Sequence, residues 1–197
     1  MSKENYYKRD AQTQNLTRTE KIKIILWRIV QSILFKPTLT PFSAWRVFLL
    51  RLFGAKIGTG CYISPQAFFY RPWNLVMGDF SSIDDFSYIK SSTPIIIGDY
   101  VSIAAFVHII PDGHDVRARN FAHVAGEIHI GHSAFIGADT FIGKGVSIGQ
   151  MAVIGARSVV MKDIPENVIA FGAPCRVMSE RLSEEEYSQY IYHNANK

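Results

Sequence analysis

Apolar residues recur at every sixth position over most of this chain. The clearest series is followed by glycine at almost every step and comprises Ile130, Ile136, Ile142, Ile148, Ile154 and Val160. Three earlier series keep the same period: Ile57, Ile63 and Phe69; Met77, Ile83 and Ile89; Ile97, Ile103 and Ile109. A period of six fits neither the 3.6 residues of a helical turn nor the two-residue alternation of an ordinary strand. It predicts short strands joined by tight turns, with one aliphatic side chain per strand pointing inward.

Three six-residue sides make one triangular coil of 18 residues, and the marked positions fill five such coils. Steps of eight residues at 69–77 and 89–97 predict two extra residues at those corners. The step from Ile109 to Ile130 is 21 residues long, which predicts a loop over 110–127 that leaves the coil. Stacked coils pair as parallel strands. We therefore predict an all-β solenoid over 57–164 and disfavour a β-sandwich, which does not keep a hexad register for so long.

The segment before the repeat is helical in pattern. Residues 1–18 are polar and aperiodic, which predicts a mobile tail. Residues 19–56 predict two helices separated by Pro37 and Pro41, the second running from Ser43, as N-cap, to Phe53. The first carries an apolar stripe at helical spacing, made of Ile22, Ile25, Leu26, Ile29, Ile33 and Leu34.

The other end is a short extension. The repeat is expected to stop after Val160, and residues 165–197 predict a C-terminal extension with a helix that begins at Ser183. Glu184, Glu185 and Glu186 would occupy the first turn of that helix, where its dipole favours anions.

Charge separates the two parts of the chain. Residues 1–56 hold eleven Lys/Arg and three Asp/Glu (+8), and the remainder holds ten and fourteen (−4). The basic helical segment has two interpretations, which are compatible. It caps the open end of the solenoid, or residues 18–56 form a peripheral membrane contact. In the membrane interpretation, anionic lipid is faced by Lys21, Lys23, Arg28 and Lys36, while Trp27 and Phe35 sit at the interface.

Several function classes are disfavoured. Two cysteines cannot form a disulfide scaffold or a four-cysteine zinc site. The apolar stretch Ile22–Phe35 is too short and too charged to span a membrane and does not resemble a signal peptide. The chain has no Walker-type loop, dinucleotide fingerprint or serine nucleophile elbow, and no nucleic-acid pattern. A cytoplasmic protein is the default expectation.

Histidines cluster in and around the loop 110–127, at His108, His114, His123, His129 and His132. Imidazole titrates near neutral pH, so such a cluster suggests general-base catalysis or metal binding.

The hexad repeat with Gly113-His114-Asp115 in its loop resembles the hexapeptide-repeat acyltransferases, among them the maltose and galactoside O-acetyltransferases. The segments Trp45–Gly58, Pro72–Leu75 and Ile154–Pro165 are most similar to the colanic-acid-type exopolysaccharide O-acetyltransferases. This resemblance implies a left-handed parallel β-helix, a homotrimer and acetyl-CoA as co-substrate. It also implies direct acetyl transfer to a saccharide hydroxyl.

The resemblance also implies site residues. His114 would be the general base, and Asp115 would orient either its imidazole or the loop backbone. Asp84 matches a polar position near the acceptor. The loop after Gly113-His114-Asp115 departs from the usual family sequence, and we expect its Arg117 and Arg119 to meet an unusual, acidic acceptor. Five residues would meet coenzyme A: Ala138 and Ala156 along the pantetheine arm, and Arg157, Lys162 and Arg176 near the phosphates.

Three alternatives remain open at this point. The acceptor could be the amine of an amino sugar rather than a hydroxyl. The fold also resembles γ-class carbonic anhydrases, which hold a metal with three histidines, but Gly137 stands where the second ligand after Gly131-His132 is needed. No metal is therefore expected. The last alternative is a non-catalytic trimeric scaffold.

Overall fold

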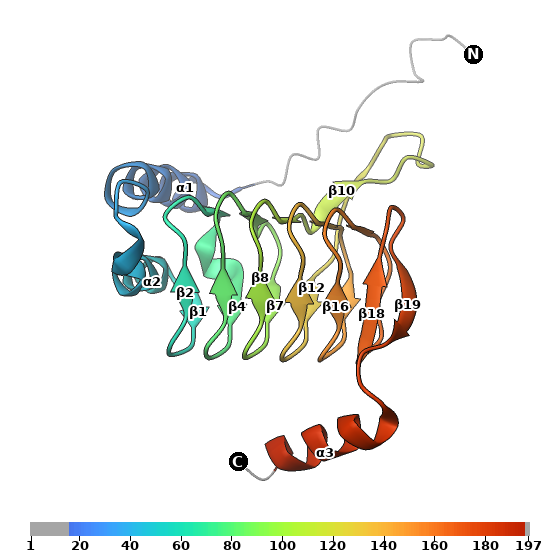
Figure 1. Ribbon diagram of the computed structural model, residues 1–197. Coiled ribbons are helices and arrows are strands. Elements are labelled where there is room, and N and C mark those ends of the chain that lie inside the picture. The colour runs from blue at the N-terminus through green and yellow to red at the C-terminus, as the bar shows by residue number, and fades with distance from the viewer. Residues whose placement is uncertain (1–15, 196–197) are drawn as a thin grey trace, which may run out of the picture.

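Short parallel strands wind into a triangular solenoid that carries helices at both ends (Figure 1). The computed structural model describes residues 16–195. Sheet A contains β1 (Lys56–Ile57), β4 (Leu75–Met77), β7 (Ile95–Ile97), β12 (Ile128–Ile130) and β15 (Ser147–Ile148). Sheet B contains β2 (Tyr62–Ile63), β5 (Ser82–Ile83), β8 (Ser102–Ile103), β13 (Phe135–Ile136), β16 (Val153–Ile154), β18 (Val168–Phe171) and β19 (Arg176–Glu180). Sheet C contains β3 (Phe68–Tyr70), β6 (Tyr88–Lys90), β9 (His108–Ile109), β14 (Phe141–Ile142) and β17 (Val159–Val160).

The hexad residues form the core of this solenoid. Each marked aliphatic position from Ile57 to Val160 is buried, and each lies in register with its equivalent one coil away, as Ile136 does with Ile154. A 3₁₀ turn, η4 (Pro72–Asn74), takes up the extra residues at the 69–77 corner. The predicted fold class, a left-handed parallel β-helix with an extruded loop and terminal helices, is confirmed.

The coil continues one turn further than the repeat indicates. Ile164 pairs with Ile148, and β18 runs parallel to β16, with Ala170 beside Ile154. The expectation that the repeat stops after Val160 was wrong, because the step from Val160 to Ile164 is four residues instead of six and the hexad spacing is interrupted there. The strand β19 then returns antiparallel to β18 and covers the last parallel edge of sheet B.

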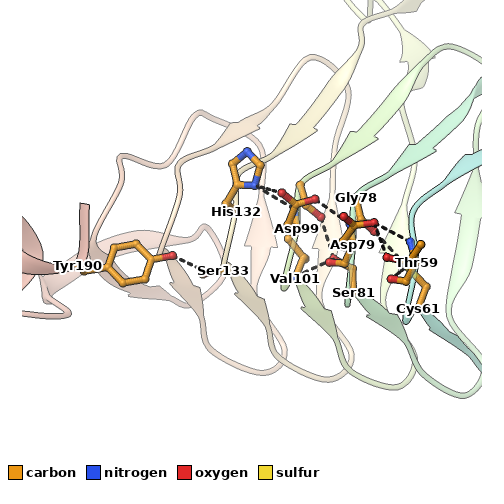
Figure 2. Close-up of polar contacts among 11 residues, drawn as sticks. Thr59, Cys61, Gly78, Asp79, Ser81, Asp99, Val101, His132, Ser133 and Tyr190 are labelled. Atoms are coloured by element: carbon orange, nitrogen blue, oxygen red, sulfur yellow. Dashed lines mark hydrogen bonds and ion pairs between the residues drawn. The ribbon is translucent and has the colours of Figure 1, made fainter. Parts of the chain in front are cut away.

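A ladder of side-chain hydrogen bonds fastens successive coils along the edge between sheets A and B (Figure 2). Asp79 Oδ1 accepts from the amide of Thr59 at 2.6 Å, and Asp99 Oδ1 accepts from the amide of Asp79 at 2.7 Å. His132 Nδ1 accepts from the amide of Asp99 at 3.0 Å. The Asp99 carboxylate passes over Gly78, where a Cβ would overlap Oδ1. Glycine at position 78 therefore leaves room for the Asp99 carboxylate and the backbone of the next coil.

The N-terminal helices cover the open end of the first coil. They are α1 (Arg18–Val30), the π-helical turn η2 (Gln31–Phe35), the 3₁₀ turn η3 (Thr40–Phe42) and α2 (Ser43–Leu52). Trp27 Nε1 donates to the carbonyl of Phe69 at 2.8 Å, and the buried ring of Phe35 lies edge-on to Phe69. The buried guanidinium of Arg46 donates from Nε to the Ile63 carbonyl at 2.7 Å. These contacts make the segment a cap.

Two expectations for this segment were wrong. Trp27 and Phe35, expected at a membrane interface, are buried against the first coil instead. Ser43 does not cap α2, because the helix begins at Ser43 itself. Its hydroxyl instead accepts from the amide of Ile63 at 2.9 Å and so fastens α2 to β2. Of the predicted polar tail, residues 1–15 lie outside the described residues, and Thr17 forms a capping box with Glu20 at the start of α1.

The C-terminal helix α3 (Glu184–Ala195) begins one residue after the predicted start at Ser183, with three glutamates in its first turn. Ser183 Oγ accepts from the amide of Glu186, whose carboxylate accepts from the amide of Ser183. A 2.6 Å hydrogen bond between Ser133 and Tyr190 connects the helix to the solenoid (Figure 2). Over residues 16–195, no helix is long and apolar enough to cross a membrane.

Candidate active site

The loop 110–127 forms a β-hairpin that projects from the edge between sheets C and A (Figure 1). Its strands are β10 (Asp112–His114) and β11 (His123–Ala125), paired antiparallel with His114 opposite His123. It leaves the coil directly after the buried Ile109 and rejoins it at Ile128. The hairpin therefore presents its polar side chains outside the solenoid, whose interior is full.

His114 is exposed, with aromatic rings on two sides. Its imidazole lies nearly parallel to the ring of Phe121, with centroids 4.7 Å apart and 12° between planes. The His123 ring lies at 89° to it, with centroids 5.7 Å apart. Phe121 adopts a left-handed backbone conformation (φ 50°), which a non-glycine residue rarely adopts. These rings restrict the orientation of the imidazole while leaving it accessible.

A charged network lies beneath His123. Asp112 Oδ2 is 2.9 Å from Lys90 Nζ and 3.3 Å from His123 Nε2, and the Asp112 side chain is only 9% exposed. Burial by itself raises the pKa of Asp112, but the hydrogen bonds from Lys90 and His123 outweigh it and hold the pKa below its usual value. The carboxylate is therefore ionised at neutral pH and connects the hairpin to β6 of sheet C.

Asp115 acts on the loop backbone. Its Oδ1 accepts from the amide of Arg117 at 2.9 Å, and its own amide donates to the Ala122 carbonyl. Of the two roles expected for Asp115, this geometry corresponds to positioning the loop. Arg117 is exposed in the turn of the hairpin, three residues after His114.

The other acceptor and cofactor candidates lie mostly on a different edge, between sheets B and C. Asp84 is exposed at the corner after β5, and its carboxylate accepts from the amide of Asp85. Ala138 and Ala156 occupy the equivalent corners after β13 and β16, where the amide of Arg157 donates to the Ala138 carbonyl at 2.8 Å. One edge of one chain thus carries Asp84, both alanines and Arg157.

The other two basic residues expected to meet coenzyme A lie on different edges of the solenoid. Arg176 begins β19 directly after the turn at Gly172, whose carbonyl accepts from Val159, so it continues the line of the B–C edge. Lys162 follows β17 and lies on the C–A edge, the edge from which the hairpin projects. The fold therefore groups Arg176 with Ala138 and Ala156 and places Lys162 on the side of His114.

The sequence interpretation left Lys90, Asp112, His123 and Phe121 without a role. Two signals were present. Asp112 precedes His114 by two residues, so both lie on one face of a strand. Lys90 directly follows the hexad residue Ile89, one coil below the point after Ile109 where the loop departs.

Two other histidines of the cluster, His129 and His132, each lie beside a nearby carboxylate. His129 lies 3.5 Å from Glu127, and His132 lies 3.1 Å from the carboxylate of Asp99. Both imidazoles are well exposed. In the described part of the chain, no three His, Cys, Asp or Glu side chains are grouped so that they could hold a metal ion.

Comparison with known proteins gives the family. No protein-family model matches the chain. It is 37% identical over 164 residues to the colanic acid biosynthesis acetyltransferase WcaF of Escherichia coli K12, covering 83% of this chain and 90% of that protein. It is 34% identical over 145 residues to the galactoside O-acetyltransferase of the same organism, covering 68% of each. A solved galactoside acetyltransferase in complex with coenzyme A superposes with a TM-score of 0.78 at 29% identity, covering 87% of both chains. The chain therefore belongs to the hexapeptide-repeat acetyltransferases, and its relatives include acetyltransferases of saccharides.

Proposed function

We propose that this protein transfers acetyl from acetyl-CoA to a hydroxyl of a saccharide during exopolysaccharide or surface-polysaccharide biosynthesis. The observation that carries the proposal is the exposed His114 imidazole, held between two aromatic rings on a hairpin that projects from a hexapeptide-repeat solenoid. The WcaF and galactoside acetyltransferase relatives support the substrate class, and the coenzyme A complex supports the donor.

The chemistry needs a base, because a sugar hydroxyl is a weak nucleophile. His114 removes the hydroxyl proton as the oxygen attacks the thioester carbonyl. A backbone amide on the neighbouring coil stabilises the oxyanion. Collapse of this tetrahedral intermediate breaks the bond between the acetyl carbon and the coenzyme A sulfur. The imidazolium of His114 then gives its proton to that sulfur. No acyl-enzyme is formed.

The two-edge arrangement supports a homotrimer with shared active sites. His114 and Arg117 lie on the C–A edge, whereas Asp84, Ala138 and Ala156 lie on the B–C edge of the same chain. A full solenoid core separates the two edges. We infer that the hairpin of one copy meets the B–C edge of the next. Coenzyme A then lies between chains, with Arg157 and Arg176 near its phosphates.

The proposed compartment is the cytoplasm, where acetyl-CoA is available. Cys61 and Cys175 are free thiols in the structure, which suits a reducing environment.

The direct test is an acceptor screen. Purified protein is incubated with acetyl-CoA and a panel of hydroxyl-only sugars and amino sugars, and thiol release and product mass are measured. We expect O-acetylated products that disappear in His114→Ala. Products confined to amino sugars would assign the protein to N-acetylation, and no product with any acceptor would favour a scaffold.

Subunit complementation tests the shared site. His114→Ala and Asp84→Ala each remove one half of it, so each homotrimer should be impaired. Trimers formed by unfolding and refolding a mixture of the two should recover part of the activity, because some interfaces combine two intact halves. Mixtures no more active than their components would contradict a site formed between chains.

A further inference from the structure

The N-terminal cap leaves a large apolar face uncovered. The stripe predicted on the first helix points away from the solenoid, with side chains 50–65% exposed at Ile22, Ile25, Leu26, Ile29 and Ile33. The opposite side of the helix, with Trp27 and Gln31, makes the contacts to the first coil. The stripe is therefore not needed for capping.

The second helix extends this face. Phe42, Trp45, Phe48 and Leu52 are all at least 40% exposed, and the rings of Trp45 and Phe48 stack with centroids 5.5 Å apart. Trp45 Nε1 donates to the carbonyl of Leu34 at 2.9 Å, which joins α2 to the end of the first stripe. We call the continuous strip over α1, η2 and α2 the apolar platform. Monomer surfaces rarely expose so many large apolar side chains together unless something covers them.

Cations line one margin of the apolar platform. At 100° per residue, Lys21 and Arg28 lie roughly a quarter turn from the Ile22–Ile29 line and on the same flank. Both are exposed, as is Lys36 at the end of η2. Within residues 16–195, none of the three pairs with a carboxylate. Their charge is therefore available to a partner.

A pocket of about 120 Å³ opens on this flank, lined by Arg28, Gln31, Ser32, Lys36 and Phe68. Gln31 is 2% exposed, and its Nε2 has no hydrogen-bond acceptor among the described residues. The Lys36 ammonium lies 5.9 Å from the centre of the Phe68 ring. A pocket lined by two cations and by a residue with an unpaired amide donor is suited to bind an anion such as a phosphate.

We propose that the apolar platform docks on an anionic lipid bilayer, with its apolar residues at the acyl boundary and the pocket holding a lipid phosphate. Apolar faces with basic margins and interfacial tryptophan are typical of helices that lie in the membrane surface. A second copy of this chain is a poorer occupant, because a two-fold contact pairs the platform with itself and the platform offers no free carboxylate to these cations. Glu20 is the one acidic residue between 16 and 53, and it belongs to the capping box of α1. The position places an acetyltransferase of surface polysaccharide beside the membrane.

Vesicle co-sedimentation tests the proposal without using the enzyme's activity. Full-length protein is mixed with phosphatidylcholine vesicles with and without phosphatidylglycerol. We expect it to pellet with the anionic vesicles, and less at high salt. Arg28→Gln/Lys36→Gln should bind about 25-fold more weakly, since each cation contributes about fivefold near an anionic surface. Ile25→Ser/Ile29→Ser should weaken binding at least about tenfold.

Matched controls lie elsewhere on the molecule. Arg119→Gln/Lys144→Gln removes two charges from the hairpin region, and Val177→Ser/Met178→Ser removes two exposed apolar residues at the far end of the solenoid (Figure 1). Both should bind like wild type, and circular dichroism checks that every variant is folded. Wild-type protein that stays in the supernatant, or platform variants that pellet like the controls, would overturn the proposal. So would a change of oligomeric mass in Ile25→Ser/Ile29→Ser with vesicle binding unchanged, because another copy would then cover the face.

Discussion

The ammonium of Lys90 lies 2.9 Å from the carboxylate of Asp112, which joins sheet C of the solenoid to the base of the hairpin that presents His114. Asp112 is nearly buried, and its second oxygen, Oδ1, has no partner among residues 16–195. The pair therefore holds the loop through one carboxylate oxygen, and His123 binds the same oxygen.

Asp112→Asn should loosen the hairpin and misplace His114. An amide keeps the shape and its oxygen can still accept a hydrogen bond, but it has no charge to form an ion pair with the Lys90 ammonium, which costs about 1–3 kcal/mol at a nearly buried site. We expect kcat to fall at least about tenfold with the KM for acetyl-CoA little changed. Amide hydrogen exchange should rise in 112–125 and stay unchanged in the solenoid strands. If amide hydrogen exchange in the hairpin of Asp112→Asn stayed at the wild-type rate, this positioning role would be contradicted.

The same variant should alter the acid dependence of stability. Because the folded pKa of Asp112 lies below the unfolded value, its contribution is fully present above the unfolded pKa. It is lost as pH falls through the folded pKa. The difference in unfolding free energy between wild type and Asp112→Asn should therefore be constant near neutrality and shrink below about pH 4. Urea unfolding across this range measures it. A difference that stays the same down to pH 2 would show that ionisation of Asp112 is not its source.

His114→Ala should reduce kcat by about 10²–10⁴-fold, the usual loss when a general base is removed. The exposed imidazole contributes little to the core, so thermal unfolding should be nearly unchanged. His129→Ala is the matched control, since that imidazole is also exposed and lies 3.5 Å from Glu127, away from the hairpin rings that flank His114. Turnover of His114→Ala close to that of His129→Ala would remove His114 from the mechanism.

Gly78→Ala should destabilise the solenoid by about 1–3 kcal/mol, because its Cβ would collide with the Asp99 carboxylate and with the backbone of Gly98 and Asp99 in the next coil. Gly113→Ala provides the comparison, since the nearest atom to its Cβ would be a Lys144 carbon 3.9 Å away. Stability of Gly113→Ala should stay within about 0.5 kcal/mol of wild type. Equal midpoints of chemical unfolding for the two variants would refute a requirement for glycine at the close approach of the coils around Gly78.

The hexad pattern predicted the core position by position, and it also predicted the departure of the loop after Ile109. It did not predict the sixth turn, because the four-residue step from Val160 to Ile164 interrupts the period. The apolar stripe from Ile22 to Leu34 was identified correctly. The sequence did not show which side of this helix packs against the solenoid. Both faces of α1 carry large apolar residues, and the buried side is decided by Trp27, which reaches the Phe69 carbonyl.

The site shows the same division. His114 could be singled out from a local motif, whereas Lys90 and Phe121 could not, since their partners depend on the path of the hairpin. The sequence by itself determined the solenoid, since each coil repeats the same short-range turn and burial requirements. Only the tertiary structure decided that Asp84 and His114 lie on different edges, that Asp112 meets Lys90 and that the apolar platform faces outward. Those features arise where irregular segments leave the repeat, so their contacts follow from three-dimensional packing rather than from local periodicity.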